Sequence, residues 1–133
     1  MVYNCVIEKD GDMFLAEFPD MPNVMTYGVS HDHALKMAKE ALDGCLEVEI
    51  LQGLPIRPPV FSGGYPVTVS CHIALTLRLR ELRGEQSQTD IAQKLGLSYQ
   101  TYQRLENPRK ANPTVKTLEK IARVYGRELN IAL

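Results

Sequence analysis

Residues 88–106, QTDIAQKLGLSYQTYQRLE, constrain the fold more than any other stretch, because they combine helical periodicity with a central break. Ile91, Ala92 and Leu95 are spaced to make the apolar stripe of one short helix. Gly96 can adopt the positive φ that ends this helix before a second one begins. The stretch therefore has the pattern of a helix-turn-helix, a motif whose second helix enters the DNA major groove. A plain helical hairpin is the alternative.

The second helix of this pattern has an apolar inward side, Tyr102 and Leu105, and a polar outward side. Ser98 can cap its beginning, because a serine hydroxyl accepts a backbone hydrogen bond there. The stretch resembles the helix-turn-helix of the Cro/C1-type repressor family, in which Tyr102 replaces the usual Ile or Val. The residues that fill the places of the family motif are Gln88, Ile91, Ala92, Gly96, Leu97, Ser98, Tyr102, Leu105 and Glu106.

This resemblance implies DNA contacts of two kinds. The outward side of the second helix matches the base-reading face of the family, where Gln can bridge adenine N6 and N7 and Arg can bridge guanine O6 and N7. Residues at the start of the first helix, around the cap of the second and in the following loop match positions near the DNA backbone. The residues predicted to read bases are Tyr99, Gln100 and Arg104, and Gln103 is a further predicted DNA-binding residue on the same outward side. The predicted backbone contacts are Gln88, Ser98, Thr101, Asn107, Arg109 and Lys110.

The formal net charge of −1 hides a strong asymmetry between the two halves of the chain. Residues 1–70 hold 4 Lys and Arg against 10 Asp and Glu, a net charge of −6. Residues 71–133 hold 11 Lys and Arg against 6 Asp and Glu, a net charge of +5, so the two halves sum to −1. This division predicts two small domains, 1–70 and 71–133, with different partners.

The acidic half is expected to have the element order βββαβ. Asp10-Gly11 is a tight-turn signal between the first two strands, and two prolines predict a loop over residues 19–23. Both faces of the first strand are apolar, so we expect it to be covered on both sides. Ser30 caps a helix that ends at Gly53, before a loop rich in Pro and Gly. The predicted strands are 2–7, 13–18, 24–29 and 65–70, and the loop is 53–66.

The first 60 residues or so resemble the HicB antitoxin domain. The resemblance lies in the DG hairpin at Asp10-Gly11, the segment FPDMP at 18–22, the exit TYG at 26–28, and a helix carrying Ala34-Leu35 and Ala38. It implies a partial ribonuclease-H-like fold without catalytic carboxylates. It also implies binding to a small, basic, mRNA-cleaving toxin of the HicA family, which suits the charge of −6. Asn23, where Gly is commoner, and the His31-Asp32-His33 helix start depart from the family pattern.

The rest of the basic half is predicted to be helical, apart from its end. Residues 72–83 alternate partly like a strand, but their leucines also recur at helical spacing, and no breaker interrupts them. We expect the arginines of this helix, Arg78, Arg80 and Arg83, to face solvent mostly.

The end of the chain is expected to be a helix followed by a strand. Asn112-Pro113 is expected to open the helix and Gly126 to end it. Residues 128–133, ELNIAL, alternate and indicate a terminal strand. A lone strand is not stable, so it would pair with a second chain, making a dimer, or with another strand of the same chain.

Candidate catalytic and metal-binding groups are few. Glu8, Asp10, Asp12 and Glu17 could be a carboxylate cluster, but most of them flank one hairpin turn, where solvated charges are normal. His31 and His33 do not face one another at the start of a helix. An odd number of cysteines without a CxxC pair indicates that Cys5, Cys45 and Cys71 are small core residues. No enzyme activity, metal or cofactor is predicted.

These patterns predict an α+β protein, with a βββαβ domain before an all-α helix-turn-helix domain that ends in a strand. With no leader or membrane segment visible, we expect a cytoplasmic protein. The function expected is that of a type II HicA-HicB antitoxin. It would neutralise a HicA-like toxin and repress its own operon as a homodimer or dimer of dimers on operator DNA. The alternatives are a stand-alone DNA-binding regulator with a ligand-sensing N-terminal domain and an active ribonuclease-H-like enzyme.

Overall fold

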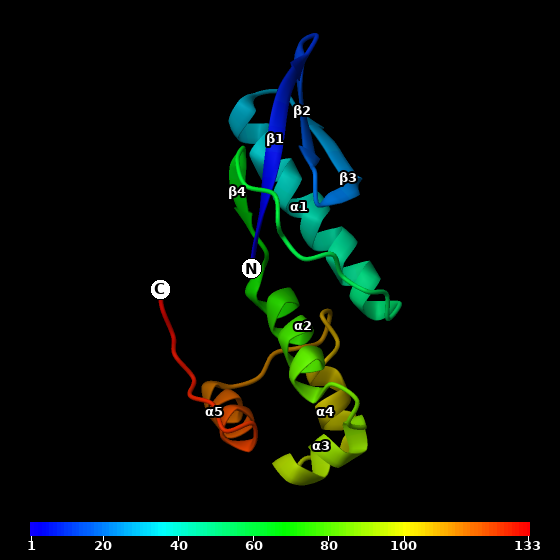
Figure 1. Cartoon of the computed structure of the whole chain (residues 1–133), viewed down its shortest axis with the longest axis vertical. Coiled ribbons are helices and arrows are strands. Elements are labelled where there is room, and N and C mark those ends of the chain that lie inside the picture. The colour runs from blue at the N-terminus through cyan, green and yellow to red at the C-terminus, as the bar shows by residue number, and fades with distance from the viewer. The chain divides into compact units, whose positions relative to one another are not determined.

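The computed structural model describes all 133 residues, which fold into two compact units, Met1–Ala74 and Leu75–Leu133. The first unit is a sheet with one helix, and the second is helical (Figure 1). The expected α+β class is therefore confirmed, as is the order βββαβ for the first unit.

The sheet of the first unit has four strands, and every neighbouring pair is antiparallel. Their order across the sheet is β3-β2-β1-β4, so the first strand lies inside the sheet. The β1–β2 hairpin turns at Gly11, whose φ of 61° is the left-handed conformation that glycine adopts without strain. The strands are β1, Val2–Asp10; β2, Met13–Phe18; β3, Met21–Gly28; and β4, Tyr65–Thr68.

The expected loop over residues 19–23 is wrong, because β3 already begins at Met21. The pairing register shifts between Glu17 and Phe18, and Phe18 then pairs with Met21. Pro22 is tolerated because β3 is an edge strand, where a missing N–H does not have to remove a sheet hydrogen bond. The two prolines therefore allow a tight connection where the sequence suggested a longer loop.

Helix α1, His31–Leu51, covers one face of this sheet. Ser30 caps it as predicted, since its Oγ accepts the His33 N–H at 3.1 Å. The helix residues buried at four-residue spacing are Ala34, Ala38, Leu42, Leu46 and Ile50.

The side of the sheet that α1 covers is set by the alternation of β1. Tyr3 and Cys5 are fully buried, whereas Val2, which points to the other face, is 41% exposed. The expectation that both faces of β1 are covered is thus wrong, because the unit has only this one helix to cover the sheet. Gly28, the last residue of β3, must be glycine, because an added Cβ would lie 2.2 Å from the Ala34 nitrogen of α1.

The loop between α1 and β4 is held by side chains of the sheet. The Asp20 carboxylate accepts the backbone N–H groups of Val60 and Phe61 at 2.9 and 2.8 Å. The Tyr3 hydroxyl donates to the Arg57 carbonyl, and burial is the main cause that raises the pKa of Tyr3 to about 12.

Strand β4 ends at Thr68, two residues earlier than expected. The next residue but one, Ser70, is instead bonded to the Asp43 carboxylate of α1.

The second unit packs four helical segments around one core. The helix predicted at residues 72–83 is confirmed, and its strand alternative is wrong, because residues 71–83 are continuously helical. The core of the unit is Leu79, Ile91, Ala92, Leu95, Tyr102, Leu105 and Ile121. The helices are α2, Cys71–Arg83; α3, Gln88–Leu95; α4, Tyr99–Leu105; and α5, Val115–Val124.

Two expectations near the C-terminus are corrected. Thr114 caps α5, with its Oγ1 accepting the Thr117 N–H at 3.2 Å, so Asn112-Pro113 precedes the helix and does not open it. Residues 128–133 do not form the expected strand. A strand needs a hydrogen-bonded neighbour, and no strand of this single chain provides one for this segment. No helix of the structure is long and apolar enough to span a membrane.

Candidate nucleic-acid interface

The turn between α3 and α4 has the geometry that the sequence predicts. Gly96 ends α3 with φ 67° and ψ 28°, and the Leu97 N–H bonds back to the Ala92 carbonyl at 2.9 Å. The cap of α3 is Ser87, whose Oγ accepts the Asp90 N–H at 3.0 Å. This cap is not among the sequence predictions, although a serine directly before the helix is its usual signal.

Ser98 caps α4 by accepting the Thr101 N–H at 3.1 Å. Its own hydroxyl donates to Thr101 Oγ1 at 2.8 Å, so both polar functions of Ser98 are used within the turn. The Thr101 hydroxyl keeps its hydrogen for an outside acceptor and is exposed. Of these two predicted backbone contacts, Thr101 is therefore the better placed donor to a phosphate.

Helix α4 separates buried from exposed side chains as the sequence predicts. Tyr102 and Leu105 are buried in the core. The residues on the opposite side form one polar, exposed surface, which comprises Tyr99, Gln100, Gln103 and Arg104. This surface combines an aromatic ring, two amides and a guanidinium, which are groups suited to base edges and phosphates.

The loop after α4 presents two cations. Arg109 and Lys110 are exposed, and both follow a turn organised by Asn107. The Asn107 Oδ1 accepts the Arg109 N–H at 2.9 Å, and its carbonyl accepts the Lys110 N–H at 3.0 Å. Asn107 is half-buried, so its oxygen shapes the loop and only its amide NH₂ remains for a DNA contact.

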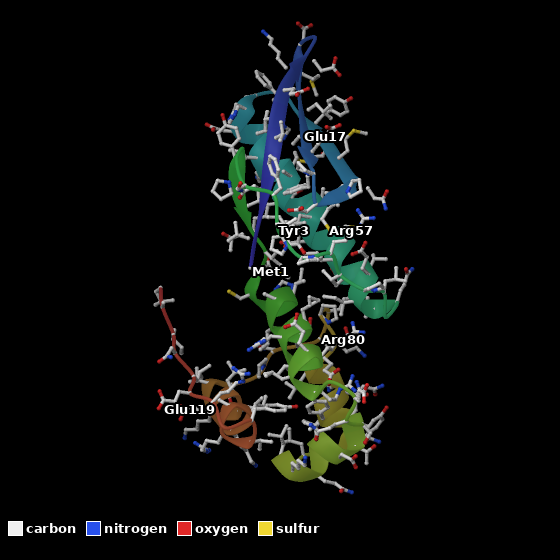
Figure 2. All side chains as sticks on the ribbon, in the orientation of Figure 1. Met1, Tyr3, Glu17, Arg57, Arg80 and Glu119 are labelled. Carbon is white, nitrogen blue, oxygen red and sulfur yellow. The ribbon has the colours of Figure 1, made fainter.

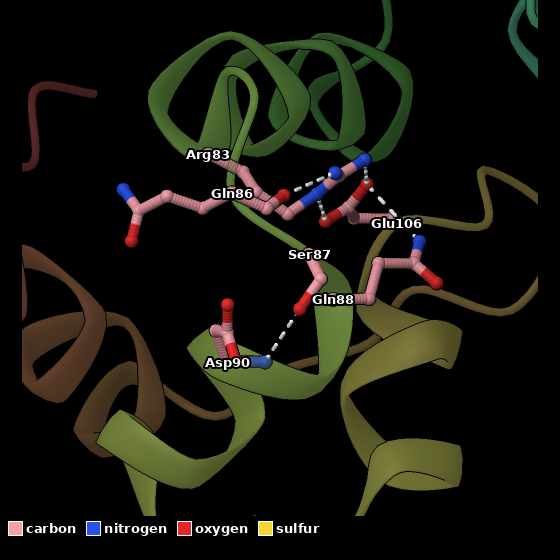
Figure 3. Close-up of polar contacts among 6 residues, drawn as sticks. All are labelled: Arg83, Gln86, Ser87, Gln88, Asp90 and Glu106. Atoms are coloured by element: carbon pink, nitrogen blue, oxygen red, sulfur yellow. Dashed lines mark hydrogen bonds and ion pairs between the residues drawn. The ribbon is translucent and has the colours of Figure 1, made fainter.

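A polar cluster joins the end of α2, the start of α3 and the end of α4 (Figure 3). Arg83 at the end of α2 donates two hydrogen bonds to Glu106 after α4, from Nε to Oε2 at 2.7 Å and from Nη2 to Oε1 at 3.0 Å. Arg83 also donates to the Gln86 carbonyl at 2.8 Å. Gln88 at the start of α3 donates to Glu106 Oε1 at 3.3 Å. We call Arg83, Gln88 and Glu106 the polar clamp.

The polar clamp corrects the expectation that Arg83 faces solvent. Only 20% of its side chain is exposed, and only 3% of the Glu106 side chain. The Glu106 carboxylate, through its hydrogen bonds, raises the pKa of Arg83, so the guanidinium keeps its charge. The clamp also orients Gln88, the predicted phosphate contact, because its side-chain amide donates one hydrogen bond to Glu106. The second amide hydrogen of Gln88 is left for a phosphate.

Two tyrosines lie beside the clamp. The hydroxyl oxygens of Tyr102 and Tyr125 are buried, and neither has a hydrogen-bond partner of good geometry. Burial raises the pKa of Tyr102 far above its usual value, and the nearby Glu106 carboxylate raises it further. Burial is also the main cause that raises the pKa of Tyr125. Both phenols are therefore neutral at physiological pH.

The candidate metal ligands of the first unit have other roles. The His31 ring packs edge-on against Tyr65, with centroids 4.5 Å apart, and His33 Nδ1 accepts the Val29 N–H at 3.0 Å. No three His, Cys, Asp or Glu side chains gather as a metal site would require. Cys5 is buried as expected, whereas Cys71 is exposed, which corrects its assignment to the core.

Comparison with known families agrees with the geometry of the second unit. Residues 79–131 match the helix-turn-helix family, and this region contains α3, the Gly96 turn and α4. The geometry and this match together give the C-terminal unit the helix-turn-helix architecture.

A similar protein extends the comparison to the whole chain. The chain is 26% identical over 129 residues to "Antitoxin HicB 1" of Photorhabdus laumondii subsp. laumondii. The aligned region covers 96% of this chain and 81% of that protein. The similarity thus includes the acidic unit as well as the helix-turn-helix.

Proposed function

We propose that this chain is the antitoxin of a type II HicA-HicB toxin–antitoxin system. Its acidic N-terminal domain, 1–70, would bind and neutralise a HicA-like toxin, a small basic ribonuclease. Its helix-turn-helix domain, 71–133, would repress the operon that encodes both proteins. The observation that carries the proposal is the similarity to an antitoxin along almost the whole chain, together with the matched helix-turn-helix.

In the DNA-bound state, the exposed side of α4 would enter the major groove. Gln100 would pair with adenine and Arg104 with guanine, and Tyr99 would contact a base edge or methyl group. The remaining predicted contacts would position the domain on the phosphates, and they would supply most of the salt-dependent affinity. These positioning residues are Gln88, Ser98, Thr101, Asn107, Arg109 and Lys110, and Gln103 would lie beside the base readers on α4.

A second copy of the chain would complete the operator-binding form. A groove between α2, α5 and the C-terminal segment is lined by Leu75, Leu79, Leu118 and Leu129, among others. Ile131, which follows the last residue that lines this groove, is 63% exposed. Pairing of residues 128–133 with the same segment of a second copy would satisfy the strand pattern of this segment. A dimer would then present two recognition helices to a two-fold operator.

Both actions in this proposal are occlusion, and neither requires catalysis by this chain. The antitoxin would cover the active site of a ribonuclease in the cytoplasm, and the bound dimer would cover a promoter. No cofactor takes part in either action.

Co-expression tests the antitoxin role. The basic toxin encoded beside this chain's gene should arrest growth when expressed alone, and co-expression of the full chain should restore growth. The two proteins should also co-purify, and the purified chain should shift DNA from its own promoter. Promoter binding without rescue or co-purification would contradict the antitoxin role. It would favour the stand-alone regulator with a ligand-sensing N-terminal domain.

A further inference from the structure

One face of the N-terminal sheet carries no helix. The register of the strands places Glu8 beside Leu15, and Leu15 beside Tyr27. It also places Glu17 beside Met25 on the same face. Side chains on a strand alternate between faces, so these residues all point away from the buried Tyr3 and Cys5, which contact the α1 side. We call Glu8, Asp10, Leu15, Glu17, Met25 and Tyr27 the open face.

The open face has an apolar centre that solvent reaches. Met25 is 57% exposed and Tyr27 is 43% exposed, and half-buried Leu15 lies next to Tyr27. The Tyr27 hydroxyl reaches the Asp10 carboxylate at 3.4 Å, which orients the ring across the strands. Exposed large apolar side chains grouped on one face mark a surface that binds another molecule.

Carboxylates surround this apolar centre. Glu8, Asp10 and Glu17 lie on the same face and are exposed, and Figure 2 shows Glu17 on the sheet. The strand residues that share this face include no Lys or Arg. An apolar centre with a rim of one charge sign selects a protein partner of the opposite sign.

The charges also decide between possible occupants. A nucleic acid would bring phosphates against three carboxylates, which is repulsive. A second copy of this chain, packed face to face about a two-fold axis, would bring the same carboxylates against one another. A basic protein that places Lys or Arg around an apolar contact avoids both conflicts.

We propose that the open face is the surface through which the N-terminal domain binds a basic protein. The inference rests on the proposed function, under which that protein is the toxin, and it assigns the contact to β1, β2 and β3. Glu17 and Glu8 would pair with cations of the toxin, while Met25 and Tyr27 would fill the centre of the contact.

Matched substitutions on the two sides of the domain test this assignment. Glu17→Lys reverses a charge on the open face, and Glu40→Lys makes the same change at an exposed position of α1. Met25→Ser removes apolar surface from the open face, and Val48→Ser does so at a comparably exposed position of α1. The full chain would be titrated with the purified toxin from the neighbouring gene, and circular dichroism melts would verify that each variant is folded.

Glu17→Lys and Met25→Ser should each weaken toxin binding about tenfold or more, because they alter charge and apolar contact within the interface. Glu40→Lys and Val48→Ser should leave the affinity within about twofold of the wild type. Added salt should weaken the wild-type complex more than the Glu17→Lys complex, since the variant has lost an attractive charge.

Three other outcomes would overturn the assignment. Wild-type affinity in both open-face variants would exclude this face while leaving the antitoxin role standing. Equal losses in Glu17→Lys and Glu40→Lys would show an effect of net charge without a specific surface. A change of oligomeric state in Met25→Ser, seen by sedimentation with unchanged toxin binding, would assign the face to a second copy. Failure of the wild-type chain itself to bind the toxin would instead reject the proposed function.

Discussion

Glu106 of the helix-turn-helix domain is almost completely buried, and its carboxylate forms an ion pair with Arg83. Arg83 and Gln88 supply three hydrogen bonds to it, and Arg83 also neutralises its charge. A buried ion pair contributes little compared with apolar packing, but removal of one partner leaves an uncompensated charge. The polar clamp therefore matters most because loss of one partner would leave the other as an uncompensated buried charge.

Arg83→Ala should lower the free energy of unfolding of the C-terminal unit by about 3 kcal/mol, because Glu106 would remain buried without its cation. Urea denaturation monitored by tyrosine fluorescence measures this change. Arg78→Ala is the matched control, since its ion pair with Glu81 is exposed at both ends. The control should lose less than about 1 kcal/mol. Equal effects of the two substitutions would contradict the special role of the clamp.

The raised pKa of Tyr3 predicts that the folded chain loses stability at alkaline pH. Its pKa of about 12 in the folded chain lies above the usual 10.0, so the folded state keeps a proton that the unfolded state releases. The stabilisation is complete below pH 10 and declines as the pH rises from there toward 12. Denaturation midpoints measured between pH 9 and 11.5 should therefore fall, and Tyr3→Phe should reduce the slope of that decline. An unchanged slope in Tyr3→Phe would assign the alkaline loss to the other groups whose pKa values are raised, which are Tyr102, Tyr125, Cys5 and Cys45.

At the scale of elements, α4 was predictable because its information is local. Ser98 caps a short helix that contains Tyr102 and Leu105, and the spacing of these two residues alone separates the buried side from the exposed side. The Arg83–Glu106 pair was not predictable, since its members are 23 positions apart and each alone reads as a surface charge. The early start of β3 was not predictable for a related reason. A proline such as Pro22 is compatible with a strand only at the edge of a sheet, and the sequence does not show that β3 is an edge strand.

Two substitutions separate base reading from phosphate binding on α4 and the loop after it. Arg104→Ala should weaken binding to the cognate operator by about 1–3 kcal/mol and relax its specificity, whereas Lys110→Ala should weaken all sequences alike. Lys110→Ala should also reduce the slope of log affinity against log salt by about 1. Fluorescence anisotropy with operator and random duplexes at several salt concentrations measures both effects. An equal loss on the two duplexes for Arg104→Ala would refute its role in base reading.

At the scale of the whole molecule, the chain combines an acidic sheet domain with a basic helical domain, and the sequence revealed this division through its charges. What the sequence could not fix is the structure of residues 128–133, since alternation indicates a strand but not its partner. The segment is irregular in the single chain, and its apolar residues Ile131 and Leu133 are exposed.

Deletion of residues 128–133 should abolish dimerisation, because the deletion removes the edge that would pair with a second copy. Analytical ultracentrifugation of the full chain and the truncated chain measures the change. Operator affinity should fall with it, since a monomer loses the second half-site. A dimer that survives the deletion would exclude this strand as the interface and direct attention to the groove between α2 and α5.

The division of labour within α4 also bears on how such proteins can diversify. Tyr102, Leu105 and Glu106 hold the helix in place, and none of them belongs to the exposed surface that would read DNA. Under the proposed function, substitutions at Tyr99, Gln100 and Arg104 should therefore change the preferred operator without disturbing the fold. Two such proteins in one cell could share a fold and still regulate separate genes, because their operator specificity would depend on exposed residues that do not contribute to the core.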